Sequence, residues 1–487
     1  MGQPILVGLD LGTSQVKAAA FAPDGTRLGK ATAPYPTDYP QPGWAEQAPA
    51  DWRQACARAM SELTAQLGDG AADIAALGLS AHAPGLVPVD AAGRALLERV
   101  PIWQDERSAP QARALLAEIG AEWVGLGLPL AAFAGKLRWF TETHPELAGQ
   151  TTLALGVKAY LAQWLTGHTA ADPSSEPAAE PAWQIVCAAC GWALDRLPPP
   201  GAPDAVVGKL RPAQARELGL RPGLPVVTGL NDGAAATLSQ GALLAGQAVI
   251  TLATNGVIYA VTERPAAAEA RLSQAIFCWP YLAGRWVVGG QTRAGAACLQ
   301  WLAGLLGGGE AADAAYAHLL AECAGRPPGG RGVRFFPYLM GQGTPHDNGE
   351  ARGAFSGLTL ATDQADLALA VLEGVAFALR EVLDALAGLG AAGGPLGITG
   401  GGARSPLWRQ IVADVLDRPL GFAEADSCLG AAMLAAAATG VHAEVAAACA
   451  AMTGAPDVTQ PRPSAAPRYA GLYTDFLRQR EAWFGRA

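Results

Sequence analysis

Two segments of this sequence share one design, and they constrain the fold more than any other feature. Ile5–Gly25 reads ILVGLDLGTSQVKAAAFAPDG: an apolar strand, a turn of small and polar residues, and a second apolar strand. Ala248–Pro265, AVITLATNGVIYAVTERP, repeats this order around the turn Ala253–Gly256. Each turn offers backbone N–H groups and a hydroxyl to one face, which is what a polyphosphate shared between two domains needs. The echo predicts two halves that are built alike, with coincidence as the alternative.

Length and charge narrow the class of protein. A chain of 487 residues is too long for one compact core, so we expect two domains. The net charge of -9 argues against a nucleic-acid or anionic-membrane partner, which requires a basic face. Met1–Pro4 lacks the features of a signal peptide, and no apolar run approaches the ~20 residues of a spanning helix. We therefore expect a cytoplasmic protein without nucleic-acid or membrane partners.

The 8 cysteines are scattered along the chain, which favours reduced thiols over a disulfide framework. Cys187 and Cys190 form a C-x-x-C pair, but no second pair or nearby histidine completes a zinc site. We interpret them as structural thiols, and their response to redox conditions stays open.

Strand and helix patterns alternate along the chain, which predicts the α/β class. Asp363–Leu386 repeats apolar residues at helical spacing, with Thr362 or Asp363 available as its N-cap. The aromatic residues after position 468 share one face of a C-terminal helix. Stretches rich in Pro and Gly, such as residues 170–181 and 455–468, predict loops.

Asp10 is an unusual residue for the centre of a run that is typical of an apolar strand. A buried carboxylate costs several kcal/mol unless a partner uses its charge. One interpretation is a phosphate-binding hairpin with Asp10 near a metal ion. The other is an ordinary hairpin in which the aspartate and the glycines only shape the turn, and this segment alone does not separate the two.

Two further segments carry possible chemistry. In Gly397–Pro419 a strand ends in three glycines, which let a flat ligand approach the backbone, and a helix follows with Ser405 near its cap. In VVTGLNDGAAATLSQGAL, Asp232 follows a strand and could accept the proton of a hydroxyl that attacks a phosphoryl group. Taken alone, helix N-capping is the preferred interpretation of Asp232.

These signals, in this order, resemble the FGGY family of carbohydrate kinases over nearly the whole chain. GLDLGTSQVKAAAF is similar to the family's first phosphate hairpin, and GWAEQAPADWRQA to the helix entry that follows it. IWQDER (Ile102–Arg107) matches a W-x-D-x-R segment, and AGKLRW, with Lys136 and Trp139, a K-x-x-W segment. GLNDGAAA resembles the catalytic-aspartate loop, FFPYLMGQGTPHDN and LEGVAFAL resemble parts of the second domain, and GGGARSPLWRQIVAD resembles the adenosine motif.

The resemblance implies two actin-like (ribonuclease H-like) α/β domains around a central cleft, residues 1–245 and 246–487. Sugar would bind mainly to the first domain and ATP mainly to the second. Asp232 would be the general base on the sugar hydroxyl, and Asp10 would hold Mg²⁺ directly or through water. The other implied nucleotide contacts are Thr13, Ser14, Lys17 and Thr254 at the phosphates, and Gly401 and Gly402 at the adenine and ribose.

The implied sugar contacts include departures from the family pattern. Members that act on D-xylulose carry Q-M-H-G where this chain has His82, Ala83, Pro84 and Gly85, so the histidine is displaced by two positions. His82 could contact sugar or be a satisfied structural histidine. Trp103 and Asp105 belong to the W-x-D-x-R segment; Asp105 and Arg107 could bind sugar hydroxyls or form an ion pair at a loop.

The second half departs as well. The usual G-E-R-x-P reads GQGTP, with Gln342 and Gly343 in place of an acid and a base. Asn255 replaces a serine beside Thr254. The phosphoryl-transfer residues thus match the family while the sugar pocket is altered.

We therefore expect an ATP-dependent sugar kinase that uses ATP and Mg²⁺, with D-xylulose as the first candidate substrate. Another ketose, a polyol or a sugar acid is the nearest alternative. A non-catalytic sugar sensor is disfavoured because Asp10 and Asp232 are retained, and an actin-like chaperone or filament protein leaves the W-x-D-x-R segment unexplained. The partners are then a small sugar and ATP, and a homodimer stays open.

Overall fold

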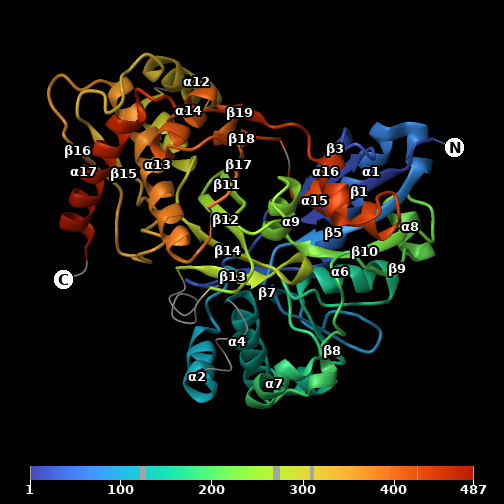
Figure 1. Cartoon of the computed structure of the whole chain (residues 1–487). Helices are drawn as coiled ribbons and strands as arrows, with labels where there is room; N and C mark the ends of the chain where they lie inside the picture. Colours follow the sequence, from blue (N-terminus) through green and yellow to red (C-terminus); the bar gives the residue numbers. More distant parts are fainter. Residues whose placement is uncertain are drawn as a thin grey trace. The chain divides into compact units, whose positions relative to one another are not determined.

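The computed structural model describes residues 2–120, 128–266, 275–307, 312–391, 393–424 and 426–485 (Figure 1). The chain forms two compact units. The first comprises Met1–Leu243, Trp279–Trp286 and Ala425–Gly454, and the second comprises Leu244–Cys278, Val287–Glu424 and Ala455–Ala487. The expected assignment of sugar to residues 1–245 and nucleotide to residues 246–487 stays a prediction.

The first unit is built on a six-stranded sheet in the order β3-β2-β1-β5-β10-β9. Its strands are β1 (Ile5–Leu11), β2 (Gln15–Phe21), β3 (Arg27–Pro34), β5 (Ile74–Ala81), β9 (Val206–Lys209) and β10 (Pro225–Asn231). β1 pairs antiparallel with β2 and parallel with β5, β5 is parallel to β10, and β9 is antiparallel to β10. The parallel strands β1, β5 and β10 are buried almost throughout, as strands covered on both faces must be.

The sheet of the second unit repeats this plan in the order β13-β14-β12-β11-β17-β18-β19. Its strands are β11 (Ala248–Leu252), β12 (Gly256–Thr262), β13 (Phe277–Pro280), β14 (Trp286–Gln291), β17 (Leu396–Thr399), β18 (Leu420–Phe422) and β19 (Asp457–Thr459). β11 pairs antiparallel with β12 and parallel with β17, β17 is parallel to β18, and β19 is antiparallel to β18. From β12 to β19 the order and directions thus match those from β2 to β9 in the first sheet, which confirms the prediction of two halves built alike.

Helices cover both sheets. In the first unit they are α1 (Pro49–Leu67), α2 (Ala109–Ile119), α4 (Leu128–Thr143), α5 (Pro145–Gln150), α6 (Val157–Thr166), α7 (Gln184–Ala189), α8 (Pro212–Leu218), α9 (Asp232–Ser239), α15 (Ser427–Ala438) and α16 (Val445–Met452). In the second unit they are α11 (Ala297–Leu306), α12 (Ala312–Cys323), α13 (Gln364–Gly388), α14 (Pro406–Leu416) and α17 (Ala466–Phe484). Short strand pairs complete the fold: β4 (Glu46–Gln47) with β7 (Val100–Pro101), β6 (Val87–Val89) with β8 (Leu153–Leu155), and β15 (Arg334–Phe336) with β16 (Ala354–Ser356).

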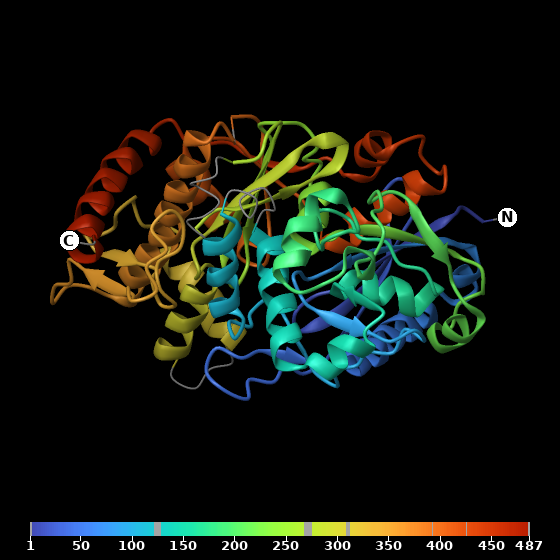
Figure 2. The ribbon, with the colours of Figure 1, turned by 90° about the horizontal axis from the view of Figure 1, so that it is seen from below.

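The expected helices of the second half are present. Asp363 is the N-cap of α13 and forms a reciprocal capping box with Asp366, which decides between the two candidate caps. Ser405 caps α14 with Pro406 in its first turn. The C-terminal helix α17 lies along the outside of the second unit (Figure 2) and buries an aromatic face on which Phe476 stacks against Phe336 with ring centroids 5.0 Å apart.

Helix α15 comes from the C-terminal part of the chain but packs on β1 and β5 of the first unit (Figure 1). Glycines make this approach possible. A Cβ at Gly8 would lie 1.8 Å from the Cys428 carbonyl oxygen, and one at Gly78 would lie 1.9 Å from that of Ala431. The helix also approaches α9, since a Cβ at Gly430 would lie 2.0 Å from the Ala235 carbonyl oxygen. The strands β1 and β5 are therefore supported by a helix that is remote from them in the sequence.

Candidate active site

The carboxyl ends of three parallel strands bring the first group of candidate residues together. Sheet register places Asp10 of β1 opposite Ser80 of β5, and Ser80 opposite Leu230 of β10. His82 follows β5 and Asp232 follows β10. Ligands of α/β sheets bind at such strand ends, so this edge of the first sheet is the candidate site.

Asp10 is 1% exposed and has two charged or polar partners. Its carboxylate accepts a hydrogen bond from the Ser80 hydroxyl at 2.8 Å and forms an ion pair with the Lys17 ammonium at 3.2 Å. Lys17 stands directly opposite Asp10 on β2, and the Asp10 charge is the main reason that the pKa of Lys17 is raised. The cost of burying the aspartate is therefore offset within the hairpin and by β5.

Asp232 begins helix α9 but does not cap it. The cap is Asn231, whose side chain accepts a hydrogen bond from the Ala234 N–H at 2.7 Å. The N-capping interpretation of Asp232 is thus wrong, because the preceding residue performs that role. Asp232 is half-buried in a dense protein environment, and burial together with repulsion from Asp10 raises the pKa of its carboxyl to about 6.

The loop that follows α6 braces Asn231. The Asn231 N–H donates to the Ser174 hydroxyl at 3.1 Å, and its side-chain amide donates to the Ser174 carbonyl oxygen at 2.7 Å. Ser174 in turn bonds Asp172, which pairs with the Lys158 ammonium at 2.7 Å. Lys158 also lies 3.7 Å from Glu176, and all of these side chains are buried. The sequence indicated only a loop here; its density of Asp, Ser and Glu was the signal for a buried polar network.

The turn between β1 and β2 is held by side chains from other segments. Gln47 donates to the Thr13 carbonyl oxygen at 2.6 Å, and the Trp103 indole N–H donates to the Thr13 hydroxyl at 2.9 Å. Tyr35 donates its hydroxyl hydrogen to the Gly12 carbonyl oxygen. Ser14 is exposed at the tip. Thr13 and Trp103, expected from separate motifs, are therefore direct neighbours.

His82 is 1% exposed, and neither ring nitrogen has a hydrogen-bond partner. Its ring meets Trp52 edge-on with centroids 5.9 Å apart, and burial lowers the pKa of the imidazole to about 4. Ala83 follows in a cis peptide with Pro84. Two unpartnered buried nitrogens argue against a satisfied structural histidine, because such groups normally have partners.

The Asp105 carboxylate forms a hydrogen bond and an ion pair within the protein. Its carboxylate accepts the Ala45 N–H at 2.7 Å and is bridged by the Arg107 guanidinium, with the closest N–O distance 2.6 Å. Arg107 also pairs with Glu46 at 2.6 Å. The ion-pair alternative for Asp105 and Arg107 is therefore present in the structure. Lys136, from the K-x-x-W segment, is buried beside the Asp105 carbonyl oxygen at 3.4 Å, and burial lowers the pKa of its ammonium to about 8.

The remaining candidates, Thr254, Gly401 and Gly402, lie at equivalent strand ends of the second unit. Thr254 is exposed in the turn between β11 and β12, and its carbonyl oxygen accepts the Gly295 N–H at 2.8 Å. A Cβ at Gly402 would lie 2.8 Å from the Leu252 side chain, so packing alone requires this glycine. A Cβ at Gly401 would meet nothing within 4 Å, so its backbone is open to a ligand.

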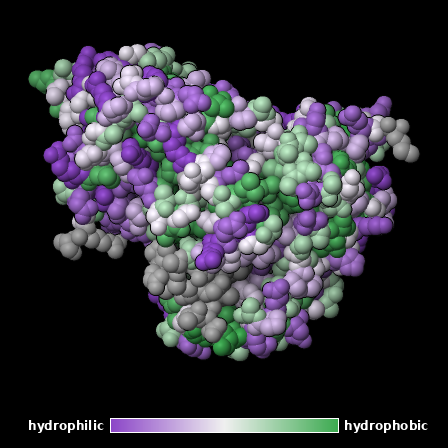
Figure 3. Space-filling view, in the orientation of Figure 1, coloured by the Kyte–Doolittle hydropathy of each residue, from purple (hydrophilic) through white to green (hydrophobic). Residues whose placement is uncertain are grey.

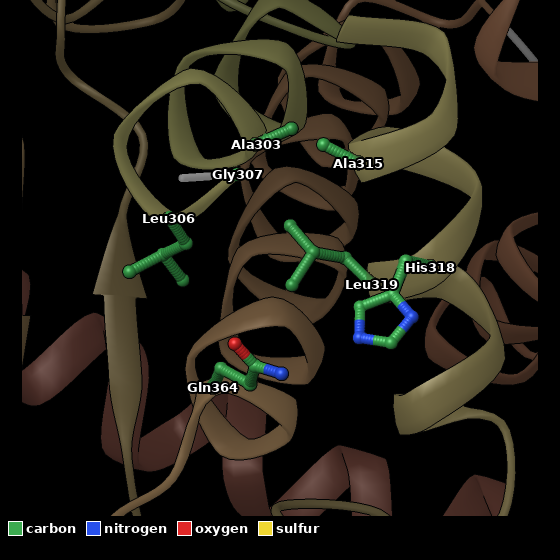
Figure 4. A pocket seen from close by; sticks show the side chains of 7 residues that line it. All are labelled: Ala303, Leu306, Gly307, Ala315, His318, Leu319 and Gln364. Carbon is green, nitrogen blue, oxygen red and sulfur yellow. The ribbon is translucent and has the colours of Figure 1, made fainter. Parts of the chain in front are cut away.

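Two cavities in the described part of the chain lie away from these residues. In the second unit a cavity of about 310 Å³ lies between α11, α12 and the start of α13, with Leu306, His318 and Gln364 among its lining residues (Figure 4). In the first unit a cavity of about 450 Å³ is lined by the loop around Glu176 and by residues 200–203. Neither is lined by any of the candidate residues above, so strand-end geometry rather than cavity volume identifies the site.

The described part of the chain contains no cluster of three or more His, Cys, Asp or Glu residues able to hold a metal. Within the same part, no helix is long and apolar enough to cross a membrane. On the face shown in Figure 3, hydrophilic and hydrophobic residues are interspersed. Cys187 and Cys190 are buried, and burial raises the pKa of both thiols to about 12, which agrees with a structural role.

Comparisons with known proteins show the family to which the chain belongs. Residues 5–239 match the N-terminal domain, and residues 248–439 the C-terminal domain, of the FGGY family of carbohydrate kinases. The chain is 34% identical to the xylulose kinase of Escherichia coli (strain K12) over 447 residues, 88% of this chain and 89% of that protein. It is 29% identical to the gluconokinase of Bacillus licheniformis over 457 residues, 89% of this chain and 88% of that protein.

A solved structure gives the same result for the fold. The crystal structure described as a xyloylose kinase from Brucella ovis superposes with a TM-score of 0.86 at 29% identity, covering 98% of this chain and 99% of that one. The actin-like α/β fold expected from the sequence is thereby confirmed, as is a sugar kinase. With both domain models matched and a relative above 30% identity along most of its length, the chain belongs to the FGGY family of carbohydrate kinases.

Proposed function

We propose that this protein transfers the γ-phosphoryl group of Mg-ATP to D-xylulose and forms D-xylulose 5-phosphate, with Asp232 as the general base. One observation carries the proposal: Asp232 is relieved of the capping role by Asn231 and stands at the strand ends beside Asp10. The Asp232 carboxylate accepts the Gly233 N–H at 2.8 Å but does not cap the helix, and with a pKa near 6 it suits proton transfer close to neutral pH. The similarity to the Escherichia coli xylulose kinase supports D-xylulose as the acceptor.

In the proposed step the sugar hydroxyl oxygen attacks the γ-phosphorus, and the bond from that phosphorus to the bridging oxygen of ADP breaks. The hydroxyl proton passes to the Asp232 carboxylate. Little covalent work falls to the protein in phosphoryl transfer, so its main tasks are positioning and charge neutralisation. The network that braces Asn231 serves the first task, because it fixes the residue directly before the base.

The residues at the strand ends fit a magnesium ion that arrives with ATP. Mg²⁺ is usually bound by one or two carboxylates together with phosphate oxygens and water, rather than by a complete protein cage. Asp10 lies close enough to Asp232 for its charge to raise the pKa of that residue, so two carboxylates are available. Asp10 would hold the ion, directly or through water. The bound ion neutralises charge on the phosphates during transfer.

Each unit carries residues that we expect to contact the phosphates. Thr13, Ser14 and Lys17 belong to the turn and second strand of the first hairpin. Thr254 occupies the corresponding turn of the second hairpin, and Gly401 and Gly402 would line the adenine and ribose, with Gly401 as the open backbone position. Lys17 is paired with Asp10, so we expect it to exchange part of that contact for phosphate oxygens.

The sugar would contact His82, Ala83 and Trp103. The two unpartnered nitrogens of His82 are available to hydroxyl groups, and the partly exposed indole of Trp103 offers an apolar face. Ala83 provides no hydrogen bond where the family pattern has methionine. Two roles stay open for Asp105, contact with sugar and support of the loop through Arg107.

A sugar acid is the second candidate substrate. The gluconokinase of Bacillus licheniformis is 29% identical to this chain over a similar length, and the segment Ser80–Gly85 departs from the pattern of D-xylulose kinases. A pocket that changes its hydrogen-bonding groups can shift specificity by several powers of ten. The same change of specificity could favour another ketose or a polyol as the substrate.

The test is ADP release from Mg-ATP with a panel of ketoses, polyols and sugar acids, for the wild type, Asp232→Asn and a control. Asp204→Asn is the matched control, because Asp204 is an exposed loop aspartate of the same unit. Loss of a general base predicts a decrease in kcat of about 10²–10⁴ for Asp232→Asn alone. Turnover of D-xylulose that survives the substitution contradicts the assignment of the base. Turnover of a sugar acid but not D-xylulose selects the second candidate.

A further inference from the structure

Thr13 of the phosphate turn is fixed by two side chains from elsewhere in the first unit. Its carbonyl oxygen accepts the Gln47 amide at 2.6 Å, and its hydroxyl oxygen accepts the Trp103 indole N–H at 2.9 Å. Indole nitrogen only donates hydrogen bonds, so the Thr13 oxygen must be the acceptor in this contact. The single hydroxyl hydrogen of Thr13 is then left to donate to another group.

The segment Ile102–Arg107, which carries Trp103, is held by contacts of Arg107, whose side chain is 4% exposed. The guanidinium bridges Asp105 and Glu46 with closest distances of 2.6 Å to each, and it lies 3.5 Å from the centre of the Trp44 ring. The backbone supports the same arrangement, because the Ala45 N–H donates to the Asp105 carboxylate. The segment Ile102–Arg107 is thereby fixed to the segment that also supplies Gln47.

We propose that Trp103 and Arg107 are positioning residues for the phosphate turn: Trp103 orients the Thr13 hydroxyl so that its hydrogen donates to a nucleotide phosphate, and Arg107 holds Trp103 in place. The inference rests on the proposed function, in which Thr13 faces the phosphates. It adds a further role to a segment expected to bind sugar or to form an ion pair at a loop. The same loop then shapes the sugar pocket and sets the hydrogen bonding of the phosphate turn.

The test is a double-mutant cycle on nucleotide binding. Affinity for the non-hydrolysable analogue AMP-PNP with Mg²⁺ is measured by calorimetry for wild type, Trp103→Phe, Thr13→Val and the double variant. Trp103→Phe keeps an aromatic ring but removes the donor, and the side chain is 44% exposed, so we expect the variant to fold. Loss of one neutral hydrogen bond predicts about five-fold weaker binding, and loss of the Thr13 hydroxyl about ten-fold or more, because its partner is charged.

The inference requires that the double variant bind no more weakly than Thr13→Val. If the two losses multiply, or if Trp103→Phe binds like wild type, Trp103 does not act through Thr13 and the inference is overturned. Arg107→Lys supplies the second cycle: lysine cannot reproduce the bridging and stacking of this guanidinium, so affinity should decrease in the wild-type background but not in Trp103→Phe. A lower Tm with unchanged affinity would reduce Arg107 to a structural role.

Arg94→Lys is the matched control, because Arg94 also pairs with an aspartate, Asp90, but on an exposed loop. Its affinity for the analogue should equal that of wild type. Sugar turnover is recorded in parallel on the same proteins. A wild type that binds the analogue but phosphorylates no sugar contradicts the proposed function, whereas additive losses with normal turnover contradict only the positioning role.

Discussion

The acid limb of the pH–rate profile should report the ionisation of Asp232. The general base must be deprotonated to accept the hydroxyl proton, and burial and the Asp10 charge raise the pKa of Asp232 to about 6. Activity should therefore rise with pH through about 6 and level off above it. One unit below the pKa about a tenth of the molecules carry the ionised base, so kcat/KM should be about ten-fold below the plateau at pH 5.

A substitution at Lys17 should move this limb in a known direction. The positive charge of Lys17 lowers the pKa of Asp232, so Lys17→Met should raise that pKa and shift the limb to higher pH, by about one unit for a charge at this range. Lys209→Met is the matched control, since Lys209 is exposed on β9 of the same unit. The limb of the control should coincide with that of wild type.

The measurement is kcat/KM for the sugar at saturating Mg-ATP, from about pH 4.5 to 8, in buffers of constant ionic strength. A limb that does not move in Lys17→Met cannot come from Asp232, whose pKa depends on the Lys17 charge. A limb near pH 4, the ordinary range of an aspartate, would show that neither burial nor Asp10 acts on this carboxyl as argued. Either result refutes the reasoning even if the enzyme is active.

Three further predictions concern stability and packing. Burial lowers the pKa of His82 to about 4, so this side chain binds a proton more readily in the unfolded chain, and the free energy of unfolding should decrease by about 3 kcal/mol between about pH 7 and 4. In denaturant unfolding, His82→Gln should lack this part of the pH dependence. An equal pH dependence in both proteins would contradict the prediction. Lys158→Met leaves the buried carboxylates of Asp172 and Glu176 without their cation, which should lower the free energy of unfolding by about 3–5 kcal/mol in the same assay. A loss below about 1 kcal/mol would contradict the ion-pair network. Gly402→Ala places a Cβ 2.8 Å from the Leu252 side chain and should lower the free energy of unfolding by about 1–3 kcal/mol. Gly401→Ala places its Cβ in open space and should keep the wild-type Tm. Equal losses of stability in the two variants would exclude the packing explanation.

The parts of the fold that the sequence predicted are those with local signals. The two hairpins carry alternating apolar strands and polar turns, and both lie where expected at the same position in each sheet. The caps Asp363 and Ser405 were readable because capping depends on residues a few positions apart. The similarity of the two halves extends from one hairpin to the order and direction of five strands.

What the sequence did not predict depends on contacts between distant residues. Helix α15 lies near the C-terminal end of the chain but belongs to the first unit. Its small side chains did not indicate that it would pack against Gly8 and Gly78 of the first sheet. Asp172 and Glu176 lie in a stretch whose prolines indicated a loop. Their carboxylates are nevertheless buried, because the Lys158 ammonium of α6 pairs with both. Asp232 was misread as a cap because Asn231 and Asp232 are equally good cap residues in sequence.

The environments of Asp10 and Asp232 explain why the site keeps two carboxylates rather than one. Asp10 pairs with a cation and accepts a hydrogen bond from a hydroxyl, and both partners favour a negative charge where a magnesium ion is needed. Asp232 lacks such a cation at hydrogen-bond distance among the described residues and is repelled by Asp10, so it gains a proton readily near pH 6. Two groups of one type are thereby suited to two tasks, holding an ion and moving a proton. Exchanging the environments, for example by pairing a lysine with position 232, should therefore abolish turnover even though both carboxylates remain.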